Sequence, residues 1–81
     1  MKHIVKPGDR IKVYEVCCPS IYVTITNEKN NIIHTKEGFK FKKHGIESRR
    51  DKYIDPLFVI EVNRQEFKDG DSLEMVEGGR I

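Results

Sequence analysis

Residues 21–35, IYVTITNEKNNIIHT, decide the fold class of this chain. From Ile21 to Thr26, β-branched and aromatic residues alternate between two faces, which is the two-residue period of a strand. The face that we expect to be buried carries Ile21, Val23 and Ile25, and the other carries Tyr22, Thr24 and Thr26. The polar tract Asn27–Asn31 favours a turn, and Ile32–Thr35 resumes the apolar pattern. The stretch therefore predicts a β-hairpin.

Four further stretches have the composition of short strands. They are Arg10–Val16, Gly38–Lys42, Leu57–Val62 and Ser72–Val76. The first follows the turn signal Pro7-Gly8-Asp9 and ends before Pro19, which interrupts the pattern, and the last follows the turn signal Asp69-Gly70-Asp71. Leu57–Val62 is apolar on both faces, which is typical of a strand that is covered on two sides or curls round a barrel.

Short strands separated by polar turns predict an all-β fold. We expect five to six strands in a small curled sheet or partly closed barrel, because a flat sheet would leave one face uncovered. The alternative is an α+β fold with one short helix near residues 46–54. The chain has 81 residues, which is the size of one domain with a small core. We expect residues 1–77 to form a single small β domain and the glycine-rich residues 78–81 to form a flexible C-terminal tail.

The segment Lys36–Tyr53, KEGFKFKKHGIESRRDKY, is the candidate binding surface, because it combines seven Lys/Arg with only three Asp/Glu. Its cations are Lys36, Lys40, Lys42, Lys43, Arg49, Arg50 and Lys52, and its aromatic residues are Phe39, Phe41 and Tyr53. The alternation of phenylalanine with lysine favours a half-buried strand with the rings in the core. Exposed rings that stack on nucleotide bases are the alternative.

The charges are sorted along the chain, with twelve Lys/Arg against six Asp/Glu in residues 1–54 and three against seven in residues 55–81. Together with the modest net charge of +2, this layout favours a small binding module that recognises a protein partner through charge-sorted surfaces or strand edges, as an inhibitor, adaptor or assembly subunit. The alternative is a small barrel that binds nucleic acid through the basic segment. A homo-oligomer would compensate for the small core.

The residue pattern gives no support to catalysis. No serine lies in a nucleophile motif and no glycine-rich phosphate loop is present, so we expect neither an enzyme nor a cofactor. The adjacent pair Cys17-Cys18 and the histidines His3, His34 and His44 lack the spacing of zinc ligands, so we expect no metal.

Location is predicted from the cysteines and from hydropathy. Adjacent cysteines cannot connect distant segments by a disulfide, which favours a reducing, cytoplasmic compartment. No apolar run approaches the roughly 20 residues of a membrane span, and the first ten residues, MKHIVKPGDR, have no apolar core followed by a cleavage site. We therefore expect no membrane association.

Overall fold

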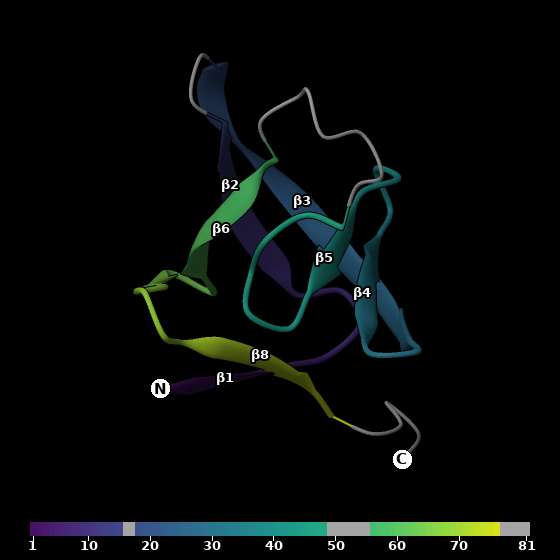
Figure 1. Ribbon diagram of the computed structural model, residues 1–81. Helices are drawn as coiled ribbons and strands as arrows, with labels where there is room; N and C mark the ends of the chain where they lie inside the picture. Colours follow the sequence, from purple (N-terminus) through teal and green to yellow (C-terminus); the bar gives the residue numbers. More distant parts are fainter. Residues whose placement is uncertain (16–17, 49–55, 77–81) are drawn as a thin grey trace.

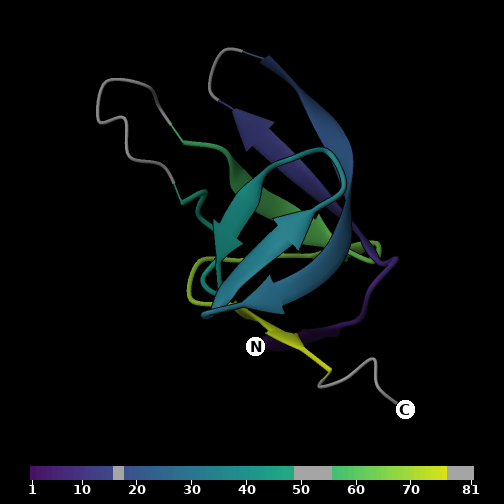
Figure 2. The same ribbon diagram turned by 90° about the vertical axis from the view of Figure 1, so that its right-hand side faces the viewer.

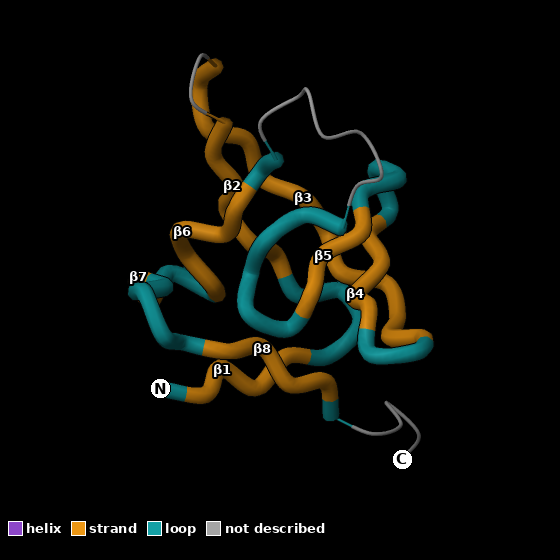
Figure 3. The backbone as a smooth tube through the Cα atoms, viewed as in Figure 1, coloured by secondary structure: helices purple, strands orange, loops and turns teal. Residues whose placement is uncertain are grey.

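Strands and loops make up all of the chain that can be described. The computed structural model describes residues 1–15, 18–48 and 56–76, and these form eight strands (Figure 1, Figure 3). The strands are β1 (Lys2–Val5), β2 (Arg10–Glu15), β3 (Cys18–Lys29), β4 (Ile32–Thr35), β5 (Lys40–Lys42), β6 (Phe58–Val62), β7 (Gln65–Glu66) and β8 (Ser72–Met75). The predicted all-β class is confirmed, although the residue pattern predicts neither β1 nor the two-residue β7.

Six of the strands form one antiparallel sheet in the order β5-β4-β3-β2-β6-β7, and the sheet curls into a partly closed barrel (Figure 2). The predicted hairpin connects β3 to β4, and its turn consists of Asn30 and Asn31, with φ angles of 54° and 64°. Asparagine tolerates this left-handed conformation, and a turn of two such residues matches the twist of the flanking strands. Residues Asn27–Lys29, which the sequence pattern assigns to the turn, therefore belong to β3.

The segment Gly45–Ser48, which we call the seam, connects β5, at one end of the curled sheet, to β6, the strand next to its other end. Four backbone hydrogen bonds of 2.8–2.9 Å hold it: from the Lys42 N–H to the Ile46 carbonyl, from Ser48 to Lys40, from Val59 to Gly45 and from Glu47 to Leu57. The first two bonds satisfy groups of β5, and the last two join the seam to β6 and to the residue before it. An open sheet would leave such edge groups without partners.

The alternative of a short helix near residues 46–54 is wrong where the structure describes that range. Ile46 and Glu47 form isolated β-bridges with Phe58 and Phe41, respectively. Residues 49–54 of the range lie outside the described residues.

β1 and β8 form a separate two-stranded parallel sheet, which lies below the curled sheet in Figure 1. His3 pairs with Leu73, and Val5 pairs with Met75. Val5 and Leu73 are each 1% exposed, because their side chains point into the barrel and close its core at this end. The partner strand of β8 therefore comes from the other end of the described chain.

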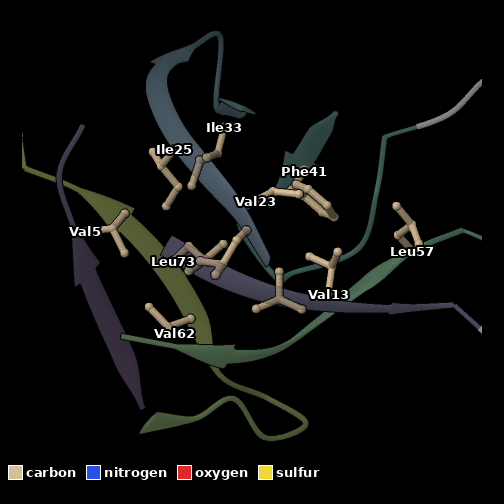
Figure 4. Packing of buried hydrophobic residues seen from close by; sticks show 11 residues of the cluster. Val5, Val13, Val23, Ile25, Ile33, Phe41, Leu57, Val62 and Leu73 are labelled. Atoms are coloured by element: carbon tan, nitrogen blue, oxygen red, sulfur yellow. The ribbon is translucent and has the colours of Figure 1, made fainter. Parts of the chain in front are cut away.

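The core is one cluster of eleven buried apolar side chains inside the barrel (Figure 4). Its members are Val5, Ile11, Val13, Val23, Ile25, Ile33, Phe41, Leu57, Val59, Val62 and Leu73. Alternate residues of β2 and β3 supply four of them, as the two-residue period predicts. Phe39, Phe67 and Met75 are partly buried and pack against the cluster.

Two residues of β3 differ from the expectation. Pro19 lies within the strand rather than ending it. At that end β3 pairs with β2 alone among the described strands, and a strand with a free edge tolerates the missing proline N–H. Ile21 was expected to be buried but is 44% exposed, although it pairs with the buried Val13. The β2–β3 hairpin therefore extends past the core at this end.

Candidate functional site

The structure describes part of the basic segment Lys36–Tyr53. Arg49, Arg50, Lys52 and Tyr53 lie outside the described residues. The exposed cations are Lys36, Lys40 and Lys42, the last two on the outer face of β5. Lys43 is half-buried, and its Nζ lies 3.1 Å from the Glu28 carboxylate of β3. Three of the four described cations are thus at the surface without an ion-pair partner in the described chain, and their binding role stays a prediction.

The two phenylalanines of the segment face the core. Phe41 is 0% exposed, and Phe39 is half-buried, with its ring centroid 6.4 Å from that of Phe41. This is the half-buried strand that the alternation with lysine favours. Phe41 is therefore not accessible for stacking on a nucleotide base in this conformation.

A mostly apolar hollow of about 540 Å³ lies beside the seam. Its walls come from the seam and the residue before it, from β6 and the residues around it, and from the loop 67–70. Hollows of this volume are typical of sites that hold a small molecule or a partner's side chain. His44, Lys68 and Asp69 place polar groups in its lining.

Two apolar side chains stand exposed at this hollow. Ile46 of the seam is 40% exposed and Phe58 of β6 is 36% exposed, and the two residues are joined by a β-bridge. The Phe58 ring packs edge-on against Tyr14, with the centroids 5.3 Å apart. The hollow also explains why Leu57–Val62 is apolar on both faces. Leu57, Val59 and Val62 belong to the core, while Phe58 and Ile60, with part of Val59, line the hollow.

A buried polar network joins the loop before β8 to β1. The Nε2–H of His3 donates to the Asp71 carboxylate at 2.9 Å, and the Lys68 N–H and the Met1 ammonium also donate to it at 2.9 Å. The His3 side chain is only 1% exposed and that of Asp71 8%. Because the carboxylate requires a donor at Nε2, the Nδ1 of a neutral imidazole is an acceptor, and it is buried without a hydrogen-bond partner among the described residues. The ring also packs on Phe67, with centroids 5.0 Å apart.

The hydrogen bond from His3, followed by those from the Lys68 amide and the N-terminal ammonium, lowers the pKa of Asp71 well below its ordinary value of 3.8. A carboxyl whose pKa is lower in the folded state stabilises the fold above its unfolded pKa, and this stabilisation is lost as the pH falls from there through the folded pKa. We therefore expect Asp71→Asn to lower the thermal midpoint at neutral pH. The difference in thermal midpoint between the wild type and the variant should narrow steadily below about pH 4. Thermal unfolding followed by circular dichroism between neutral pH and pH 2 measures this difference. A difference that stays constant with pH would contradict this role of Asp71.

A second hollow, of about 320 Å³, lies on the outer face of β2 and β3 next to the turn between β6 and β7. Arg10, Tyr22 and Arg64 line it, and Lys12 follows two residues after Arg10 on β2. Local sequence patterns do not reveal this group, because the four residues come from three separate stretches. The strand register, which pairs Lys12 with Tyr22, brings them together.

The strand edges of Ile21–Thr26 and Ser72–Val76, where a partner's strand could pair, already have hydrogen-bond partners at some positions. Ser72–Val76 pairs with β1 on one side, and on the other the Leu73 N–H donates to the Lys43 carbonyl at 2.7 Å. In Ile21–Thr26, the Thr24 carbonyl accepts from the Lys36 N–H, and the Thr24 N–H donates to the Glu37 carboxylate. The apolar hollow is therefore a better candidate than a strand edge.

In residues 1–15, 18–48 and 56–76, no three histidine, cysteine, aspartate or glutamate side chains are grouped so that they could hold a metal ion. The same residues contain no helix with the length and hydropathy of a membrane span. The sequence matches no protein-family model, and neither the curated proteins nor the solved structures contain a significant match to the chain.

Proposed function

We propose that this protein is a small non-catalytic binding module that recognises a protein partner through the hollow beside the seam. The observation that carries the proposal is the exposure of Ile46 and Phe58 at this apolar hollow. Pockets that receive an apolar anchor supply most of the binding energy of many protein interfaces. The charged groups of Lys68 and Asp69 and the imidazole of His44 then serve as the polar rim.

A non-catalytic role agrees with the position of the His3–Asp71 pair. These side chains have the hydrogen bond of a catalytic dyad, but with 1% and 8% exposure they are not accessible to a substrate. Their position between β1 and the loop before β8 supports a structural role. The exposed cations Lys40 and Lys42 would steer an acidic partner towards the protein without taking part in a reaction. The adjacent cysteines support a reducing, cytoplasmic setting for this interaction.

Affinity capture from the source cells tests the proposal. The bait is the tagged full chain, as wild type, as Ile46→Ser and as Ile4→Ser. Ile4 is the matched control, because it is 52% exposed and lies on β1 rather than at the hollow. We expect wild type and Ile4→Ser to capture the same partner, and Ile46→Ser to capture at least about tenfold less of it, the loss expected for an interface anchor.

Three outcomes would contradict the proposal. They are the capture of no specific partner by the wild type, equal capture by all three baits, and a capture that nuclease treatment abolishes. Light scattering of the purified protein is the companion measurement, because a second copy of the chain is itself a protein partner. A dimer that Ile46→Ser dissociates and Ile4→Ser preserves would identify the partner as this chain.

A further inference from the structure

The second hollow and the adjoining face of β2 carry three cations near one exposed aromatic ring. Tyr22 is 50% exposed, and the Arg10 guanidinium and the Lys12 ammonium lie 5.4 and 5.6 Å from its ring centroid. Arg64 lines the same hollow from the turn after β6. Cations at this distance from an aromatic ring are held by its π-electrons while their N–H groups remain free to bind an anion.

The carboxylates near this hollow form no ion pair with these cations in the described part of the chain. Asp9 lines the hollow, and its carboxylate accepts from the Lys6 N–H of its own loop at 3.0 Å and from the side-chain amide of Asn63, in the β6–β7 turn, at 3.1 Å. The Lys6 ammonium lies 3.5 Å from it, and the Asp9 side chain is 13% exposed. Within the described residues no carboxylate lies within ion-pair distance of Arg10, Lys12 or Arg64, although Glu61 is the cross-strand neighbour of Lys12.

Arg64 occupies a backbone conformation that disfavours it. The turn between β6 and β7 consists of Asn63 and Arg64, with φ angles of 48° and 71°. Glycine is the favoured second residue of such a turn, and a long side chain is strained there. The turn between β3 and β4 has the same left-handed pair of conformations but uses Asn30 and Asn31, which tolerate them. A strained residue whose side chain lines a cationic hollow points to a role for that side chain.

From these observations we propose that the outer face of β2 and β3, with the β6–β7 turn, binds single-stranded nucleic acid. Arg10, Lys12 and Arg64 contact the phosphates, and Tyr22 offers its exposed ring to a base. The lining of this hollow is polar and cationic, as in nucleic-acid interfaces, whereas a protein anchor requires an apolar pocket such as the one beside the seam. The proposal does not rest on the proposed protein-binding function, because it concerns different residues of the surface.

The test is fluorescence anisotropy of a labelled oligothymidine of about twelve nucleotides, titrated with the full chain. With three phosphate contacts, the logarithm of the binding constant should fall with the logarithm of the salt concentration with a slope of about −2. The affinity should therefore drop by about 20-fold between about 50 and about 200 mM salt. Tyr22→Leu should weaken binding by about tenfold, whereas Tyr22→Phe should retain it.

Arg64→Gly is the decisive variant, because it should weaken binding without weakening the fold. We expect a loss of about threefold to tenfold in affinity at the lower salt concentration and a salt slope shallower by about 0.7. The thermal midpoint should stay the same or rise by about 2–4 °C, since glycine relieves the strain of the turn. Unfolding of the variant can therefore not explain the loss of binding.

Two control variants accompany Arg64→Gly. Asn31→Gly places glycine in the other left-handed turn, and Lys29→Ser removes one positive charge from the exposed end of β3; both should bind like the wild type. The proposal is overturned if the wild type does not bind at the lower salt concentration, if binding is indifferent to salt, or if Lys29→Ser weakens it as much as Arg64→Gly. It is also overturned if polyglutamate of equal charge competes as well as unlabelled oligothymidine, because the face would then bind acidic protein segments.

Discussion

Phe41→Ala is expected to lower the free energy of unfolding by about 3–5 kcal/mol, the cost of deleting a fully buried ring and leaving a cavity. Phe41 is 0% exposed and is the largest side chain among the fully buried residues of the core. A domain of this size has a total stability of only about 4–12 kcal/mol, so the variant should be marginally folded at room temperature. Urea unfolding followed by circular dichroism measures the change.

Phe58→Ala is the matched control for this prediction. It deletes a phenyl ring of the same size from β6, where the side chain is 36% exposed. We therefore expect the free energy of unfolding to fall by only about 1–2 kcal/mol. If Phe41→Ala cost no more than Phe58→Ala, the Phe41 ring would lie at the surface. The alternative in which the basic segment presents Phe41 for base stacking would then regain support.

Gly45→Ala is expected to cost about 2–4 kcal/mol, because two effects add at this position. Gly45 has a φ of +90°, which disfavours any residue with a Cβ atom. In addition, a Cβ at this position would lie 2.6 Å from the Cε1 of Phe67, and that ring packs on His3 and against the core. The Gly45 carbonyl also accepts the Val59 N–H, so a shift of Gly45 would disturb the link between the seam and β6.

Gly38→Ala separates the two effects. Gly38 has a φ of +97°, but nothing lies within 4 Å of the position that its Cβ would take. This variant should therefore show the conformational strain alone, about 1–2 kcal/mol. The difference between the two variants in urea unfolding measures the contact with Phe67. Equal costs would show that the seam does not approach the loop 67–70 as closely as the structure indicates.

Local patterns predict those parts of the fold that depend on neighbouring residues. The alternation of Ile21–Thr26, followed by asparagines, is sufficient to predict the β3–β4 hairpin, because strand period and turn conformation are both local properties. The alternation of Phe39 and Phe41 with lysines likewise predicts the buried face of β5. The Asp69-Gly70-Asp71 signal correctly marks a turn, in which the Asp71 N–H donates to the Lys68 carbonyl at 2.9 Å.

The rest depends on contacts between distant segments, which local patterns do not contain. β1 is too short to stand out in the sequence, and its parallel partner β8 lies at the other end of the described chain. The cluster of Arg10, Lys12 and Tyr22 exists only because of the register between β2 and β3. The turn between β6 and β7 is not predicted from the sequence, since its second residue, Arg64, is not of a type that indicates a left-handed conformation. The hollow beside the seam exists only because the seam bonds to β5 and β6, and these hydrogen bonds form only when the sheet curls.

Amide ¹H–¹⁵N spectra of the labelled protein, recorded with and without the captured partner, test most directly whether the hollow beside the seam is the recognition surface. We expect the largest shift changes at Ile46, Phe58, Ile60 and Phe67, with little change at Ile4 on β1. Changes concentrated on β1 or on the outer face around Tyr22, with the residues of the hollow unaffected, would contradict the proposed function.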